Sequence, residues 1–513
     1  MRKKIVLFAL LLGIQTQSYA ADLIQVYQQA LFSDPTYQAA IAQRMSDQEG
    51  VPINGSQLLP QANISGGPSL TRFHQTAAGA IPEYSATSRG YSLTLTMTQT
   101  VFNYAQFKAL AGACATSKQA DATLNAAAQD LMLRVSQAYF AVLRDEDNLI
   151  YSRGNKKAFA QQYDQISQHY KSGMKTITDA DTARSSYDTA VAAYIAAETA
   201  LANDQENLRA ITGNLYPALA KLSGRFPLIS PQPAEIDAWV RTAKQQNWAI
   251  RASTYALQAA RENIKRQYAG HLPTVSVQGA YNVGYNNNLS GTSAANAPIQ
   301  EAPFIAPNRA HTTDASVTLN LGIPIFAGGG VVAETKQARY NYEVALQKLE
   351  AAVRATENNT RQSYLGIQLG IQQLQADKQA IKSTISSLEG LRSGFHVGTQ
   401  TLVDVLNQQQ KVYQAQTQYA ADRYAYVNNL LLLKQAAGTL SEQDLQAINA
   451  WLTEDDAQAE TPVVESKAVN STSTRKLTIG LNKARQHKSR HQIIDAALNK
   501  QLAMGGPDLT LTP

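Results

Sequence analysis

The chain has 513 residues, of which 44% are hydrophobic and 16% are charged, and its formal net charge is +6. Three positive charges lie at residues 2–4 and a surplus of four lies in residues 458–513, so the body between them is close to neutral. A neutral body argues against a nucleic-acid partner, because proteins that bind nucleic acids carry a basic face on the folded domain.

The N-terminus has the pattern of a secretory signal peptide. Residues 2–4 are basic, residues 5–14 are apolar, and small residues stand at positions 18 and 20. This order predicts export with cleavage after Ala20. No other apolar run reaches the ~20 residues that a membrane-spanning helix needs, so a membrane-embedded part would have to consist of β-strands.

The first half continues with a helix, two strands and a very long helix. Residues 22–55 have a helical composition, and a strand-like pattern begins at residue 64. After a polar loop at 74–89, residues 91–98 alternate between large apolar side chains and Ser or Thr, which is the period of a strand. Residues 103–170 contain no proline and only two glycines, which predicts one helix.

The second half has the same order of elements. Residues 275–286 and 316–325 alternate as strands on either side of a longer loop, and residues from 327 to about 395 are helical in composition. We expect Leu319 and Leu321 on an apolar face and Thr318 and Asn320 on a polar face.

Each of the two long helices would span ~100 Å. Helices of this length indicate coiled-coil packing, and their many Gln and Asn residues place them in an aqueous compartment rather than in lipid. Cys114 is the only cysteine, which excludes an internal disulfide, and its alanine-rich surroundings predict a small buried residue.

The chain is two copies of one unit. Residues 173–179 correspond to residues 398–404 at an offset of 225, whereas Pro60 corresponds to Pro273 at an offset of 213. The longer loop predicted at 286–313 absorbs the difference. Each copy therefore contains a helix, two strands, a very long helix, a turn and a further helix.

Four strands per chain cannot close a membrane barrel. An open sheet in lipid leaves edge N–H and C=O groups without partners, and membrane barrels have at least eight strands. Three chains would supply twelve strands, with the polar strand faces lining water. The predicted fold class is therefore an α+β membrane protein, in which a trimeric 12-stranded β-barrel continues into a long α-helical barrel.

Five segments, in order, carry a resemblance to a known family: 22–30, 211–214, 270–274, 323–329 and 397–406. In these segments the chain resembles the TolC family of outer-membrane efflux and type I secretion channels. The resemblance runs from about residue 21 to residue 451 and implies a barrel in the outer membrane, a helical barrel across the periplasm and a mixed α/β belt around the helices.

The resemblance implies a function and partners. The chain would be the outer-membrane exit duct of tripartite efflux pumps or of type I protein secretion, a passive homotrimer in outer-membrane lipid opened by a periplasmic adaptor and an inner-membrane pump of RND or ABC type. The expected organisation is a signal peptide at 1–20, a first repeat at 21–215, a linker at 216–234, a second repeat at 235–452 and a polar, disordered tail at 453–513.

Two turns are predicted to form the periplasmic tip. They lie at Gly173 and Gly398, and each is followed by Thr-x-x-Asp, which is a capping-box pattern. Asp179 and Asp404 have two open interpretations: they cap helices only, or they also form rings of carboxylates around the three-fold axis that attract cations.

The family closes its tip with polar bonds, and three positions of this chain depart from that pattern. Phe395 stands at the family's gate Tyr, Gln400 at its gate Arg and Asn407 at its second entrance-ring Asp, whereas Asp179 and Asp404 match. Phe cannot make the hydroxyl bond, and the neutral Gln cannot supply the positive charge of Arg. Two alternatives stay open: the gate is held differently, for example by a bond from Gln400 to Asp179, or it is looser.

Catalysis and metal binding find no support in the sequence. The seven histidines have no metal-ligand spacing, and Gly328, Gly329 and Gly330 lack the Lys-Ser/Thr of a phosphate loop. These glycines predict instead a bend from barrel to helix. We therefore expect no enzyme activity, catalytic residue, metal or cofactor. The alternative is a periplasmic adaptor, which has one helical hairpin in a lipoyl-like domain rather than two equivalent halves.

Overall fold

The computed structural model describes residues 20–76, 84–224, 226–293 and 309–453. The predicted signal peptide, apart from Ala20, and residues 454–513 of the predicted tail lie outside the described residues. Thr453, which was placed in the tail, is paired in a short strand.

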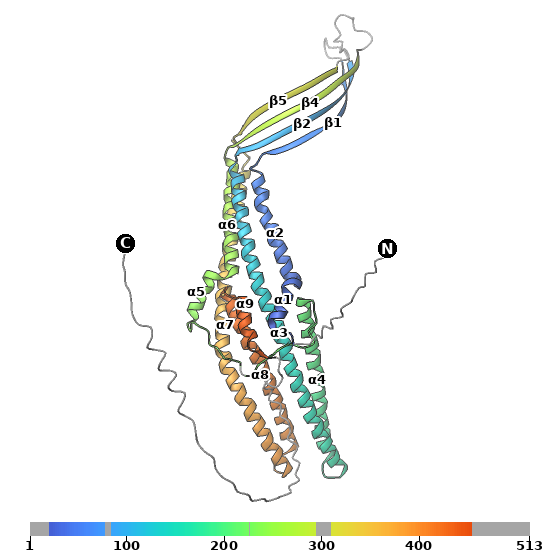
Figure 1. The fold of residues 1–513 in the computed structure, drawn as a ribbon, viewed down its shortest axis with the longest axis vertical. Coiled ribbons are helices and arrows are strands. Elements are labelled where there is room, and N and C mark those ends of the chain that lie inside the picture. The colour runs from blue at the N-terminus through green and yellow to red at the C-terminus, as the bar shows by residue number, and fades with distance from the viewer. Residues whose placement is uncertain (1–19, 77–83, 225, 294–308, 454–513) are drawn as a thin grey trace, which may run out of the picture. The chain divides into compact units, whose positions relative to one another are not determined.

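One antiparallel sheet contains strands from both halves of the chain, in the order β1-β2-β4-β5 (Figure 1). The central pair β2–β4 joins the two repeats, with Leu95 opposite Tyr281. The strands are β1 (Gln61–Gln75), β2 (Tyr84–Phe102), β4 (Thr274–Ser293) and β5 (Arg309–Gly322).

The strands are longer than the sequence predicted. Much of the predicted loop at 74–89 and of the loop at 286–313 belongs to strands, since β2 begins at Tyr84 and β5 at Arg309. These segments are rich in Ser, Thr, Asn and Gly and lack a clear apolar alternation. Because a ladder is made of backbone hydrogen bonds, a polar segment continues it once its neighbour is in register.

Two very long helices follow the strands. Helix α3 (Tyr104–Lys171) starts one residue after β2, where Asn103 caps it by accepting hydrogen bonds from Ala105 and Gln106 N–H. Helix α7 (Gly330–His396) is its counterpart in the second repeat. Each turns back into a shorter helix, α4 (Ile177–Thr212) and α8 (Leu402–Ala436), so each repeat ends in a helical hairpin.

Shorter elements pack against the long helices. The cluster of buried apolar side chains includes Leu23, Tyr139, Phe140, Tyr426 and Leu445, and so joins both repeats. The remaining elements are α1 (Leu23–Ser33), α2 (Pro35–Ser56), β3 (Lys221–Leu222), α5 (Ile236–Gln246), α6 (Trp248–Tyr268), the 3-10 turn η1 (Ala269–His271), α9 (Glu442–Asn449) and β6 (Leu452–Thr453).

The prediction of a buried Cys114 was wrong for the protomer, where this residue is exposed. An alanine-rich stretch indicates close helix packing but not which face of the helix is packed. The single helix predicted for 22–55 was also wrong, because α1 and α2 are separated by Asp34, which ends one helix and caps the next.

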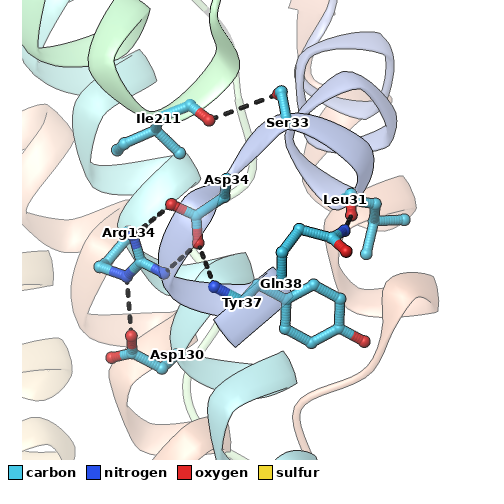
Figure 2. Close-up of polar contacts among 8 residues, drawn as sticks. All are labelled: Leu31, Ser33, Asp34, Tyr37, Gln38, Asp130, Arg134 and Ile211. Atoms are coloured by element: carbon cyan, nitrogen blue, oxygen red, sulfur yellow. Dashed lines mark hydrogen bonds and ion pairs between the residues drawn. The ribbon is translucent and has the colours of Figure 1, made fainter. Parts of the chain in front are cut away.

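Asp34 fixes this break against α3. Figure 2 shows its two carboxylate oxygens facing Arg134, at 2.8 and 3.3 Å, and one of them accepting the Tyr37 N–H at 2.9 Å. Arg134 also bonds Asp130 at 2.7 Å. Asp34 is only 2% exposed. Burial raises its pKa, but the bonds from Arg134 and Tyr37 outweigh burial, and the net pKa lies below the ordinary value.

We expect Asp34→Ala to lower the free energy of unfolding by about 3 kcal/mol at neutral pH, because it removes a cap and leaves Arg134 without its buried partner. Since the folded pKa is lowered, this contribution is present above the unfolded value of about 3.9 and is lost as pH falls through the folded value. The wild type should therefore unfold at a higher temperature than Asp34→Ala at neutral pH, and this difference should shrink in acid. Thermal unfolding followed by circular dichroism measures it. Asp188→Ala, at an exposed i,i+4 pair with Arg184, is the control and should change little.

Candidate functional site

The sheet has one apolar and one polar face, as the sequence predicted. Leu319 pairs with Val277 and Leu321 with Val275, so these apolar side chains lie on one face. Thr318 pairs with Gln278 and Asn320 with Ser276, and these polar side chains lie on the other face. On the polar face Thr94 donates to Asn282 at 2.9 Å.

The apolar face is uncovered in the protomer. Val317, Leu319 and Leu321 are 82%, 68% and 61% exposed, and Leu95 and Met97 lie on the same face. A continuous exposed apolar surface of this kind is unfavourable in water and marks contact with lipid or protein. The described residues include no helix long and apolar enough to cross a membrane.

The bend between sheet and helix differs between the two repeats. In the first repeat Asn103 alone separates β2 from α3, whereas residues 323–329 separate β5 from α7. Gly328 and Gly329 have φ of +61° and +83°, a conformation that favours glycine, and Gly330 is the first residue of α7.

At the far ends of α3 and α7, each hairpin turns at a glycine. Gly173 and Gly398 have φ of +75° and +82°, as expected for helix ends. The predicted capping boxes are both present. Thr176 accepts the Asp179 N–H at 3.2 Å while Asp179 accepts from Thr176, and Thr401 and Asp404 repeat this arrangement.

The two carboxylates are therefore helix caps within the protomer. The Thr401 hydroxyl and backbone N–H bonds lower the pKa of Asp404, so this carboxylate is ionised at neutral pH. Asp179 and Asp404 belong to different hairpins, and no described contact joins them.

Of the three positions predicted to form the gate with departures from the family, Phe395 is the one that contacts the other hairpin. Its ring packs against an apolar cluster of α3, α4 and α8 that includes Ile166, Ala183 and Leu402. The Lys175 ammonium lies 4.9 Å from the ring centroid. Sequence reasoning missed Lys175, because nothing in its surroundings distinguishes it from other lysines at a helix turn.

Gln400 and Asn407 are exposed in the protomer. Gln400 does not bond Asp179 among the described contacts; its backbone N–H donates to Gly394 O. A Cβ at position 394 would lie 2.6 Å from Gln400 Cγ, which explains the glycine there.

A buried charged cluster connects the two repeats and was missed by the sequence analysis. Arg423 of α8 bonds Asp147 of α3 at 2.5 Å, and the Tyr424 hydroxyl donates to the same carboxylate at 2.9 Å. Burial raises the pKa of Asp147, and Arg423 and Tyr424 offset this only in part. Charged residues in a long helix predict a solvated face, so no signal in the sequence pointed to burial.

The family is decided by comparison with known proteins. The family model described as "Outer membrane efflux protein" matches residues 26–214 and 239–439, which is one match in each half of the chain. The chain belongs to the outer membrane efflux protein family. This confirms the predicted family, the two repeats and an outer-membrane location. The chain is therefore an outer-membrane channel protein and not the periplasmic adaptor that was the alternative.

Matches to related proteins cover most of the length of this efflux protein. Outer membrane protein TolC of Vibrio cholerae is 36% identical over 454 residues, covering 88% of this chain and 99% of the relative. The alkaline protease secretion protein AprF of Pseudomonas aeruginosa is 25% identical over 446 residues, covering 86% and 89%. The CmeC outer membrane channel of Campylobacter jejuni shares the fold, with a TM-score of 0.67 at 15% identity, over 85% of this chain and 90% of CmeC.

The Asp147–Arg423 pair should hold the two hairpins together. We expect Arg423→Leu to lower the free energy of unfolding by about 3–5 kcal/mol, because it leaves a buried carboxylate unpaired, and Asp147→Leu/Arg423→Leu to recover most of the loss. Chemical unfolding of the purified protein measures both. Arg354→Leu, at an exposed pair with Glu350, should be nearly neutral. Equal losses in the single and double variants would contradict this account.

Proposed function

We propose that this efflux protein is a trimeric, passive exit duct through the outer membrane, serving a tripartite efflux pump or a type I secretion system. The observation that carries the proposal is the sheet, with one exposed apolar face, one polar face and edge strands β1 and β5 that pair with no other described strand on their outer sides. The secretion role is supported by AprF, which is a protease secretion protein.

Three copies of the chain would pair the edge strands of the sheet. If β5 of one protomer pairs with β1 of the next, twelve strands close and every edge N–H and C=O group finds a partner. The apolar face then contacts lipid and the face with Thr94 and Asn282 lines a water-filled lumen. Helices α3 and α7, which follow β2 and β5 in the chain, extend this conduit into the periplasm.

The tips are where a partner opens the duct. Met174 and Ile177 in one turn and Val397 and Val403 in the other are exposed apolar side chains. They suit docking of a periplasmic adaptor and an inner-membrane pump of RND or ABC type. Cargo moves passively, so the function requires no catalytic residue and no cofactor.

The gate combines the two tip turns. Phe395, under Lys175, holds the second hairpin to the first through apolar and cation–π contact in place of the polar bonds of the family. Asp404 forms a ring of three carboxylates near the axis, and Gln400 and Asn407 flank it. Gly173 and Gly398 form the turns, Asp179 caps α4, and Gly328 to Gly330 form the bend below the barrel.

The assembly is tested by mass. The detergent-solubilised protein should be three times the mass of one chain by native mass spectrometry, and it should form ion-conducting pores in planar bilayers. Cysteine introduced at Leu319 should react with lipid-phase reagents, and cysteine at Thr318 with aqueous ones. A monomer or dimer without pore activity would rule out the proposed duct.

The carboxylate ring is tested by conduction. We expect Asp404→Ala to reduce cation selectivity and block by multivalent cations, and Asn407→Asp to strengthen that block, because ring charge attracts cations. Asp179→Ala is the matched control, since it removes the equivalent cap from the other hairpin. Unchanged selectivity and block in both Asp404→Ala and Asn407→Asp would mean that Asp404 is a cap and nothing more.

A further inference from the structure

A carboxylate interrupts the apolar seam between α7 and α8. Asp377 is 7% exposed and lies between the buried residues Leu374 and Ile381, three and four positions away on the same face of α7. Leu374, Ile381 and Tyr419 of α8 belong to the main apolar cluster. An aspartate at such a position is rare unless another group compensates its charge.

The group that faces Asp377 is a second carboxylate. The α7–α8 packing brings Asp422 level with it, because the Lys378 ammonium, one residue further along α7, lies near the ring of Tyr419, three residues before Asp422. The Asp422 carboxylate acts on the pKa of Asp377 as a hydrogen-bonding neighbour. One oxygen of Asp377 accepts from Gln373 at 2.9 Å, and one oxygen of Asp422 accepts from Gln418 at 2.9 Å. The remaining oxygen of Asp377 is buried and has no donor among the described residues. Two carboxylates can hydrogen-bond to each other only if one of them carries a proton.

The cations closest to the pair along the two helices are engaged elsewhere. The Lys378 ammonium lies 5.9 Å from the centroid of the Tyr419 ring, and Arg423 bonds Asp147 and Tyr424 toward α3. Neither Asp377 nor Asp422 forms an ion pair with any described Lys, Arg or His. The negative charge of the pair is therefore left to be balanced by a proton.

We propose that Asp377 and Asp422 share one proton across the α7–α8 seam in mild acid, and that losing this proton loosens the second hairpin as pH rises. Two adjacent carboxylates that cannot both ionise without repulsion are a well-understood proton site. A shared proton turns the repulsion into a hydrogen bond between the helices, so the seam has two states that differ by one charge.

The direction of the pH effect follows from the titration. Burial, and then Asp422, raise the pKa of Asp377 to about 6. Because this lies above the unfolded value of about 3.9, the folded hairpin binds the proton more tightly than the unfolded chain does. The stabilisation is full below pH ~4 and is lost as pH rises through about 6.

The pair is placed to influence the tip. Asp377 lies 18 residues before Phe395 on the same helix, which is ~27 Å at 1.5 Å per residue. A loosened seam would free the second hairpin near the gate, so the duct would open more readily above pH 6. This consequence for conduction rests on the proposed function, whereas the shared proton does not.

Infrared difference spectroscopy of the full-length protein in detergent tests the proton directly. The wild type should show a protonated carboxyl C=O band that disappears with an apparent pKa of about 6. Subtracting the spectrum of Asp377→Asn or Asp422→Asn isolates this band from that of other buried carboxyls, including Asp147. Asp181→Asn, at an exposed position of α4, is the matched control and should keep it. A wild-type spectrum identical to both pair variants overturns the proposal.

Hydrogen exchange tests the effect on the seam. After correction for intrinsic exchange rates, peptides of α7 and α8 around the pair should be roughly tenfold less protected at pH 7.5 than at pH 5, since each pKa unit corresponds to a factor of ten. Asp377→Asn should abolish this difference, because its amide donates to Asp422 at either pH. An unchanged pH dependence in Asp377→Asn refutes the shared proton. Neither readout requires conduction, so a protein without pores would refute the proposed duct and leave these results standing.

Discussion

Strands β1 and β5 each have one row of backbone N–H and C=O groups that no other described strand satisfies. In contact with lipid, each unpaired group would cost several kcal/mol, which makes a lone protomer an incomplete structure. The pairing of β2 with β4 puts one edge strand from each repeat on opposite sides of the sheet. The duplication of the chain thus produces a unit with one unpaired edge strand from each repeat, as the proposed pairing with further copies requires.

The helical hairpins follow from the sheet. Helices α3 and α7 continue from β2 and β5, so the spacing of the strands sets where the helices start. In aqueous surroundings these helices must bury a seam of their own, and they do so with small and apolar side chains interrupted by polar contacts. Gln408 donates to Thr384 O at 3.1 Å and Arg392 to Gln409 at 2.7 Å across the second hairpin. Such contacts add little stability but define the register of the two helices.

At the tip, an aromatic contact stands where the family resemblance predicts a polar bond. Phe395 cannot make a hydroxyl bond, yet its ring occupies the contact between the hairpins and is covered by Lys175. A cation above an aromatic face is less directional than a hydrogen bond to a carboxylate. The contact therefore tolerates small displacements of the two turns, and Asp179 and Asp404 remain available as caps.

The sequence by itself determined the order of elements, the duplication, the two faces of the sheet and the capping boxes, because each is written in local spacing: period two for strands, long proline-free runs for helices, and Thr-x-x-Asp at the turns. Only the tertiary structure decided the ends of the polar strands, the break at Asp34, the exposure of Cys114 and the partners of Phe395, Asp147 and Asp377. These depend on which helix faces meet and on backbone hydrogen-bond ladders that a polar sequence pattern does not predict. A charge on a long helix has the same local pattern whether it faces water or another helix, and only packing distinguishes the two.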